Sequence, residues 1–164
     1  MQEQDRRAPA WRLSARLVTR LAHLWFLLAR PMTLGVRGLV LDDAGQVMLV
    51  KHGYAPGWQL PGGGVEVGET FAAALERELA EEANIVLEGP PTLHGLFLNR
   101  PISRRDHVAV YVVRRFRVSG ERVPDREIVA ARFFSVASLP PDATRGTRSR
   151  LAEVLEGAPI SPLW

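Results

Sequence analysis

The chain has no cysteine among its 164 residues, so disulfide bonds, thiolate metal ligands and a cysteine nucleophile are excluded. Any metal ion must be bound by oxygen atoms or imidazole, and a carboxylate cluster favours a hard ion over zinc. Lysine is almost absent too, because Lys51 is the only one. The net charge of +3 therefore depends on arginine, which binds phosphate well and weakly indicates anionic substrates.

Long apolar runs are also missing, since no segment approaches the roughly 20 residues that a membrane span needs. Residues 11–30 instead predict an amphipathic helix that ends before Pro31, with a stripe of Leu13, Leu17, Leu21, Leu24 and Leu28. We expect this helix to pack on the domain or in a homodimer. A membrane-surface helix, a signal peptide and an anchor remain alternatives. The predicted division is a tail and helix over 1–30 and a globular domain over 31–164, and we expect the protein to be cytoplasmic.

From Thr33 onward the pattern changes to strands. Two apolar runs, 34–42 and 46–52, are expected to form a hairpin joined by a turn at Asp42–Gly45. Further strands are expected at 93–99, 107–118 and 129–134. Helical patterns occupy the segment after Glu69 and the segment from about Thr147 to Glu156. This order predicts an α/β fold with a mixed sheet between helical layers.

The segment from Gly63 to Ile85 carries the strongest chemical signal. From Glu69 onward, its acidic residues are Glu69, Glu76, Glu78, Glu81 and Glu82. Positions 78, 81 and 82 share one helical face, where like charges repel by about 0.2–0.5 kcal/mol per pair. An exposed acidic helix is the simpler alternative, but it does not explain the glycines at 62–64 that precede the helix. A bound cation would explain both features.

The spacing of these residues resembles the signature of the Nudix family. Gly63, Glu69, Arg77, Glu78, Leu79, Glu81, Glu82 and Ile85 occupy the positions of that signature. Asn84 stands where the family has glycine, which is a mild change because asparagine also tolerates the left-handed conformation. The resemblance implies a Nudix-type α/β/α sandwich that hydrolyses a diphosphate linked to another moiety.

The resemblance also implies a site that binds Mg²⁺ or Mn²⁺. The metal ligands it implies are Gly62, through its carbonyl, with Glu78, Glu81, Glu82 and Glu127. Arg77 would hold the carboxylates, and Glu81 would assist catalysis. The general base is Glu82 or, as a second choice, Glu127, which lies in a segment similar to a later loop of the family. Asp106 could take this role in place of Glu127. Glu127 could also simply be an exposed acid of a solvated loop.

Residues that could bind the substrate are less clearly marked. The candidates are Arg37, Tyr54, Trp58, Arg100, Arg104, Arg105 and His107. Arg37 interrupts an apolar strand, which suggests a cleft. Trp58 could stack on a base, but its surroundings favour a structural role in the fold. The arginines could clamp a phosphate or simply lie in solvent.

The expected substrate is a small nucleotide or another diphosphate. An RNA 5′-end pyrophosphohydrolase is a less favoured alternative, because the basic residues cluster only locally. A non-catalytic Nudix-derived ligand sensor is the alternative from another class of protein. All three box acids, Glu78, Glu81 and Glu82, are retained, which argues against a sensor.

Overall fold

The computed structural model describes Trp25 and residues 31–164, of which residues 33–164 form one compact unit. The predicted amphipathic helix over residues 11–30, with its dimer or membrane role, lies outside the described residues apart from Trp25. Within the described part, no helix is long and apolar enough to cross a membrane.

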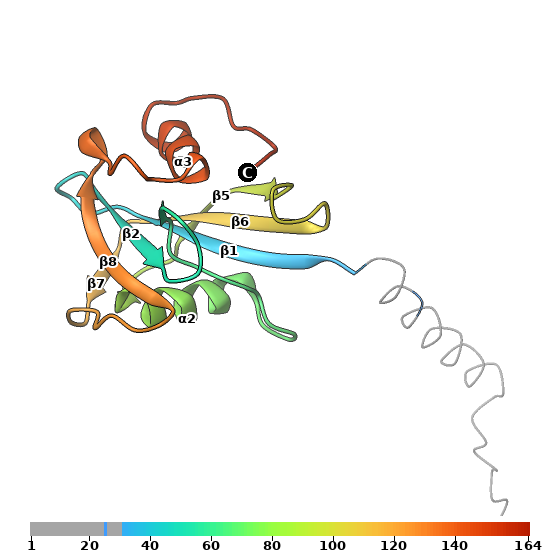
Figure 1. Cartoon of the computed structure of the whole chain (residues 1–164), viewed down its shortest axis with the longest axis horizontal. Helices are drawn as coiled ribbons and strands as arrows, with labels where there is room; N and C mark the ends of the chain where they lie inside the picture. The colour runs from blue at the N-terminus through green and yellow to red at the C-terminus, as the bar shows by residue number, and fades with distance from the viewer. Residues whose placement is uncertain (1–24, 26–30) are drawn as a thin grey trace, which may run out of the picture. The chain divides into compact units, whose positions relative to one another are not determined.

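The strands of this unit form three small sheets (Figure 1). The first contains β1 (Thr33–Val40), β6 (Asp106–Val113) and β5 (Thr92–Leu98), in that order. The second contains β3 (Trp58–Gln59), β2 (Gln46–His52) and β8 (Ile128–Ser135). A two-stranded ribbon pairs β4 (Ile85–Leu87) with β7 (Phe116–Val118). Only the β1–β6 pair is parallel, so the sheet structure is mixed, as predicted.

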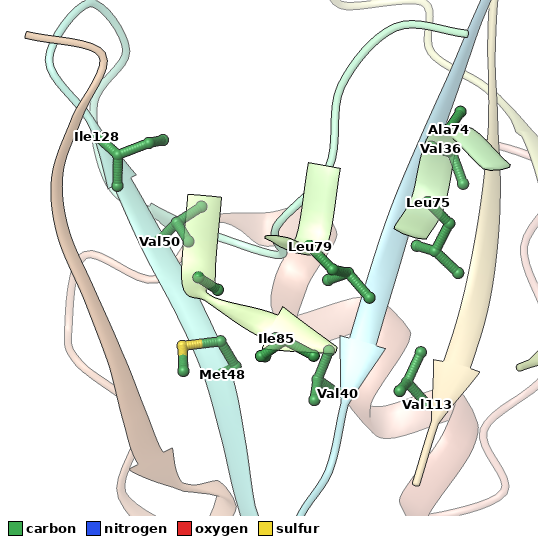
Figure 2. Packing of buried hydrophobic residues seen from close by; sticks show 11 residues of the cluster. Val36, Val40, Met48, Val50, Ala74, Leu75, Leu79, Ile85, Val113 and Ile128 are labelled. Carbon is green, nitrogen blue, oxygen red and sulfur yellow. The ribbon is translucent and has the colours of Figure 1, made fainter. Parts of the chain in front are cut away.

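Two helices cover opposite faces of the strands. Strands β1 and β2 alternate between two core clusters: Val36 and Val50 contribute to one, and Leu39 and Leu49 to the other. The first cluster packs against α2 (Phe71–Ala83), as Figure 2 shows, and the second includes Leu151 of α3 (Arg145–Leu155). This two-sided burial produces the predicted α/β/α layers, with α2 and α3 on opposite sides in Figure 1.

Helix α2 is defined locally at both ends. The Thr70 side chain caps its start by accepting a hydrogen bond from the Ala73 N–H at 3.2 Å. Asn84 ends it with φ 52° and ψ 35°, which confirms the predicted left-handed conformation. Its side-chain amide also donates to the Gly120 and Glu121 carbonyls, at 3.3 and 3.1 Å. The end of α2 is thereby tied to the loop that follows β7.

Two strand predictions were wrong in detail. The run over 107–118 is not one strand, because it ends at Val113 and resumes at Phe116 in another sheet. The turn at Asp42–Gly45 exists, with Gly45 at φ 72°, but the strands that it joins enter different sheets. Only Leu41 and Val47 pair across it. A short 3₁₀ helix, η1 (Val136–Ser138), follows β8.

Candidate active site

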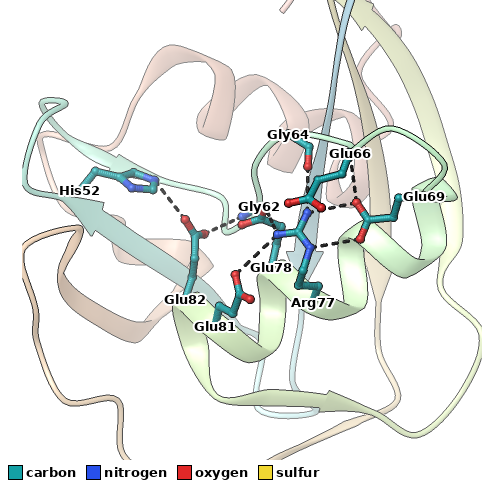
Figure 3. A network of polar contacts seen from close by, with 9 residues as sticks. All are labelled: His52, Gly62, Gly64, Glu66, Glu69, Arg77, Glu78, Glu81 and Glu82. Atoms are coloured by element: carbon teal, nitrogen blue, oxygen red, sulfur yellow. Dashed lines mark hydrogen bonds and ion pairs between the residues drawn. The ribbon is translucent and has the colours of Figure 1, made fainter.

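Arg77, in the middle of α2, is the centre of a polar network between this helix and the preceding glycine loop (Figure 3). Its Nε and Nη2 atoms donate to the two carboxylate oxygens of Glu69, both at 3.1 Å. Nη1 donates to Glu78 Oε1 at 2.7 Å and lies 3.5 Å from Glu81 Oε2, while Nη2 also reaches the Gly64 carbonyl at 3.0 Å. The hydrogen bond from Arg77 lowers the pKa of Glu69. The guanidinium thus connects the glycine loop to α2.

Glu82 is the buried member of the cluster, with 5% of its surface exposed. Its Oε2 accepts a hydrogen bond from the Gly62 N–H at 2.7 Å, and Oε1 lies 3.7 Å from His52 Nε2. Burial raises the pKa of Glu82 to about 7, although the hydrogen bond from Gly62 and the positive charge of Arg37 act to lower it. In the described part of the chain, no arginine or lysine forms an ion pair with this carboxylate.

His52 does not supply that charge. Its side chain is buried, and burial, followed by the nearby Arg37, lowers its pKa below the ordinary 6.5. Neither ring nitrogen has a hydrogen-bond partner among the described residues, because 3.7 Å is too long for a hydrogen bond to Glu82. A neutral imidazole therefore faces the carboxylate.

The carboxylates surround one hollow of about 330 Å³. Its walls come from α2 and from the loop before β8, and they comprise Glu78, Glu81, Glu82, Arg122, Asp125, Glu127 and Ile128. Arg122 pairs with Asp125, and this hydrogen bond lowers the Asp125 pKa to about 2. Arg122 is thus already paired with Asp125, and the hollow is lined mainly by acidic side chains.

The glycine loop lies against the same carboxylates. A Cβ atom at Gly63 would come within 2.4 Å of Glu78 Oε1, and Gly62, at φ 137°, is packed against the Val36 carbonyl. Any larger side chain at these positions would fill the space that the backbone and Glu78 now share. The glycines are therefore needed for close approach, as the sequence suggested.

A neighbouring cleft of about 470 Å³ contains two of the predicted substrate residues, Arg37 and Tyr54. Arg37 Nη1 donates to the Leu60 carbonyl at 3.0 Å, and burial lowers its pKa although Glu82 partly opposes the effect. The Tyr54 ring lies 5.1 Å from that of His52, and burial and then Glu127 raise the Tyr54 pKa. Gly63 and Gly64 also line the cleft, so it borders the acidic hollow.

The structure corrects the substrate role considered for Trp58. Its ring is 8% exposed and meets Phe134 edge to face, with centroids 4.6 Å apart in the second core cluster. Trp58 is therefore a core residue and not a stacking surface.

The basic segment after β5 is not gathered at the acidic hollow either. Arg100 lines a separate cavity near α3, and Arg104 and Arg105 are exposed. His107 is partly buried, and its Nδ1 has no hydrogen-bond partner in the described part of the chain. Asp106 accepts hydrogen bonds from Asn99 and Thr33 and is absent from the hollow, which separates it from the glutamates. Glu127 and Asp106 were the two candidates for the acid that completes the metal site, and only Glu127 lines the hollow.

The donor chemistry of the hollow fits a hard divalent cation, because it offers several carboxylate oxygens and no sulfur. Among the described residues, no three acidic or histidine side chains already converge at the spacing that an ion requires. The reason lies in their present partners: Arg77 holds Glu78, and the Gly62 N–H holds Glu82. Gly62 contacts the cluster through its N–H, so the ligand role of its carbonyl stays a prediction.

Comparison with known proteins identifies the family. A model of the NUDIX domain matches residues 31–155, which is most of the chain. The chain belongs to the Nudix family. The MutT NUDIX hydrolase from Burkholderia pseudomallei is similar in structure, with a TM-score of 0.64 and 32% identity over 74% of this chain and 97% of that one. The Nudix fold predicted from the sequence is confirmed.

Two curated relatives of this Nudix chain have named activities. An ADP-ribose pyrophosphatase from Methanocaldococcus jannaschii is 30% identical over 104 residues, which is 62% of this chain and 61% of the relative. An RNA pyrophosphohydrolase from Acinetobacter baylyi is 44% identical over 52 residues, or 31% of each chain. The chain thus spans less than two thirds of the curated relatives that it matches.

Sequence reasoning missed His52, Arg122 and Asp125. Arg122 and Asp125 lie in a polar loop whose course a periodicity argument cannot follow. His52 follows a continuous apolar run, so its position at the end of β2 was the only available signal.

Proposed function

We propose that this protein is a divalent-cation-dependent pyrophosphohydrolase that cleaves the diphosphate of a nucleoside diphosphate linked to another moiety. The observation that carries the proposal is the acidic hollow, in which glutamates from α2 and from the loop before β8 face one space. The glycine loop and the cleft containing Arg37 adjoin it. The Nudix membership and the pyrophosphatases named among its relatives support the same reaction class.

Glu78, Glu81, Glu82 and Glu127 would hold Mg²⁺ or Mn²⁺, with the Gly62 carbonyl as the further ligand implied by the family. When bound, such ions neutralise charge on the phosphate oxygens and lower the pKa of coordinated water. Arg77 acts as a positioning residue, because its bonds to Glu69, Glu78 and Gly64 fix the helix against the loop.

The general base is better assigned to Glu127 than to Glu82. Glu82 is buried and its Oε2 is already bonded to the Gly62 N–H. Glu127 is exposed on the opposite wall of the hollow, and its carboxylate makes no hydrogen bond to the described residues. It can therefore accept a proton from an attacking water at one of its two carboxylate oxygens. Arg37, partly buried at the edge of the cleft, supplies fixed positive charge toward the phosphates.

RNA 5′-end hydrolysis is the second candidate activity. The relative from Acinetobacter baylyi is an RNA pyrophosphohydrolase, and Arg104 and Arg105 are exposed near the cleft-lining residues Ile102 and Asp106. A non-catalytic sensor is less well supported, since every box glutamate is present and faces the hollow or Arg77.

The test is hydrolysis of a substrate panel by the full chain with Mg²⁺. The panel comprises nucleoside triphosphates, ADP-ribose and other sugar nucleotides, dinucleoside polyphosphates and 5′-triphosphorylated RNA, scored by release of phosphate, pyrophosphate or mononucleotide. Glu127→Gln should lower kcat by about 10²-fold or more on the best substrate, within the range expected for loss of a general base. Glu76→Gln, on the exposed side of the same helix, is the matched control and should leave kcat unchanged. No turnover of any substrate by the wild-type protein would contradict the proposal.

A further inference from the structure

The cleft beside Arg37 contains groups that diphosphate chemistry does not use. Besides Arg37 and the glycine loop, its walls include the Asp106 carboxylate and the apolar or aromatic side chains of Leu34, Pro101, Ile102 and Trp164. A carboxylate repels phosphate oxygens, and apolar walls do not stabilise them. This part of the cleft is therefore suited to an uncharged group attached to the diphosphate.

Asp106 is held as a fixed hydrogen-bond acceptor. Thr33 Oγ1 donates to its Oδ1 at 2.7 Å, and Asn99 Nδ2 donates to its Oδ2 at 2.7 Å. Asn99 is itself 8% exposed, so the pair is anchored from the protein interior. A carboxylate has about four acceptor positions, so each oxygen keeps one for a further donor. No ion pair neutralises Asp106 within the described part of the chain.

Trp164 is fixed in the wall by the C-terminal segment. The backbone N–H of Trp164 donates to the Leu98 carbonyl at 3.1 Å, and the backbone N–H of Leu98 donates to the Pro162 carbonyl at 2.9 Å, so this segment follows the end of β5. Its indole lies so close to Gly146 that a Cβ there would be 2.5 Å from Nε1. Figure 1 shows the C-terminal end beside β5. Trp164 lies beyond residue 155, where the stretch matched by the NUDIX domain model ends.

We propose that Asp106 and Trp164 select the group attached to the diphosphate by recognising a nucleobase. Trp164 contacts the planar face of the base, and Asp106 accepts hydrogen bonds from its N–H groups. Guanine presents two adjacent N–H donors on one edge, which matches the two free acceptor positions of a carboxylate. The site therefore prefers guanine to adenine. This inference rests on the proposed function only for the position of the diphosphate next to the glycine loop.

The test is calorimetric binding of GMP and AMP to the full-length protein, measured without metal so that hydrolysis plays no part. Asp106→Asn should weaken GMP binding by about tenfold or more, because hydrogen bonds to a charged acceptor are lost, and should affect AMP much less. Trp164→Ala should weaken both nucleotides, and Trp164→Phe should recover most of the loss because a planar ring is retained. Asp142→Asn, at an exposed ion pair with Lys51, is the matched control and should change neither affinity.

A base-free ligand, methylenediphosphonate, separates recognition from folding. Its affinity in the presence of Mg²⁺ should be the same in the wild type, Asp106→Asn and Trp164→Ala. Equal weakening of GMP and methylenediphosphonate, or an unchanged preference for GMP over AMP in Asp106→Asn, would overturn the assignment. If the wild type hydrolyses no diphosphate but the variants still change GMP binding as expected, the proposed function fails and the recognition site stands.

Discussion

The buried carboxylate of Glu82 makes a specific prediction about stability and pH. Burial raises its pKa in the folded protein to about 7, whereas the unfolded chain has the ordinary value of 4.5. The folded state therefore binds the proton more tightly than the unfolded state. Its contribution to stability is fully present below about pH 4.5 and is lost as the pH rises through about 7. Glu82→Gln removes this titration while keeping the shape of the side chain.

The pKa values set the size of the effect. Each pKa unit corresponds to about 1.4 kcal/mol, so ionising Glu82 costs the metal-free protein about 3 kcal/mol once the pH exceeds 7. Relative to the wild type, the free energy of unfolding of Glu82→Gln should therefore rise by about 3 kcal/mol between pH 4.5 and pH 8. Saturating Mg²⁺ should reduce this difference, because it binds the folded wild-type site.

The assay is urea unfolding in EDTA across this pH range, with Glu81→Gln as the matched control. Glu81 lies beside Glu82 in the sequence, but its side chain is 63% exposed, so its substitution should produce no comparable pH dependence. Both variants keep the other titrating groups of the protein, including His52. The difference between their pH profiles of stability therefore reports mainly on Glu82. Parallel pH profiles for Glu82→Gln and Glu81→Gln would refute the reasoning.

Three further predictions concern other contacts. In Gly63→Ala, the new Cβ atom would lie 2.4 Å from Glu78 Oε1, so the variant should fold normally but displace the flexible Glu78 carboxylate. Its Mg²⁺ affinity, measured by calorimetry, should therefore fall about tenfold. An unchanged affinity would contradict the argument that Gly63 is needed for close approach. Asn84→Val should destabilise the protein by at least about 1 kcal/mol more than Asn84→Gly in thermal melts, because a branched residue tolerates φ 52° poorly. Equal melting temperatures would show that the left-handed end is not limiting. Although burial alone would raise the pKa of Glu153, hydrogen bonds from His94 and other donors lower it, so its stabilising effect is present above about pH 4.5 and is lost below it. Acid unfolding followed by fluorescence should therefore show a smaller loss of stability between pH 5 and 3 in Glu153→Gln than in the wild type.

Features set by local chemistry could be predicted from the sequence. The box helix, the left-handed Asn84 and the grouping of its glutamates follow from spacing along one helix, which fixes the relative positions of residues three or four apart. Glu127 was placed with them only through resemblance to the family, since no periodicity connects a loop residue to a helix far away in the sequence.

Features that depend on long-range packing could not be predicted. The turn at Asp42–Gly45 suggested a paired hairpin, but parallel pairing of β1 with β6 sends its two strands into different sheets. A structural role was favoured for Trp58, but its packing partner Phe134 comes from β8 and could not be named from the sequence. The position of Trp164 in the cleft depends on the path of a terminal segment along β5, which no local pattern indicates.

The most direct test of the metal site is equilibrium binding of Mn²⁺, followed by the loss of the free-ion signal in electron paramagnetic resonance. The wild-type protein should bind Mn²⁺, Glu82→Gln should weaken the binding by about tenfold or more because an amide lacks the ligand charge, and the exposed Glu76→Gln should bind like the wild type. Absence of Mn²⁺ binding by the wild type, or equal affinity in Glu82→Gln, would contradict the assignment of the acidic hollow as the catalytic metal centre.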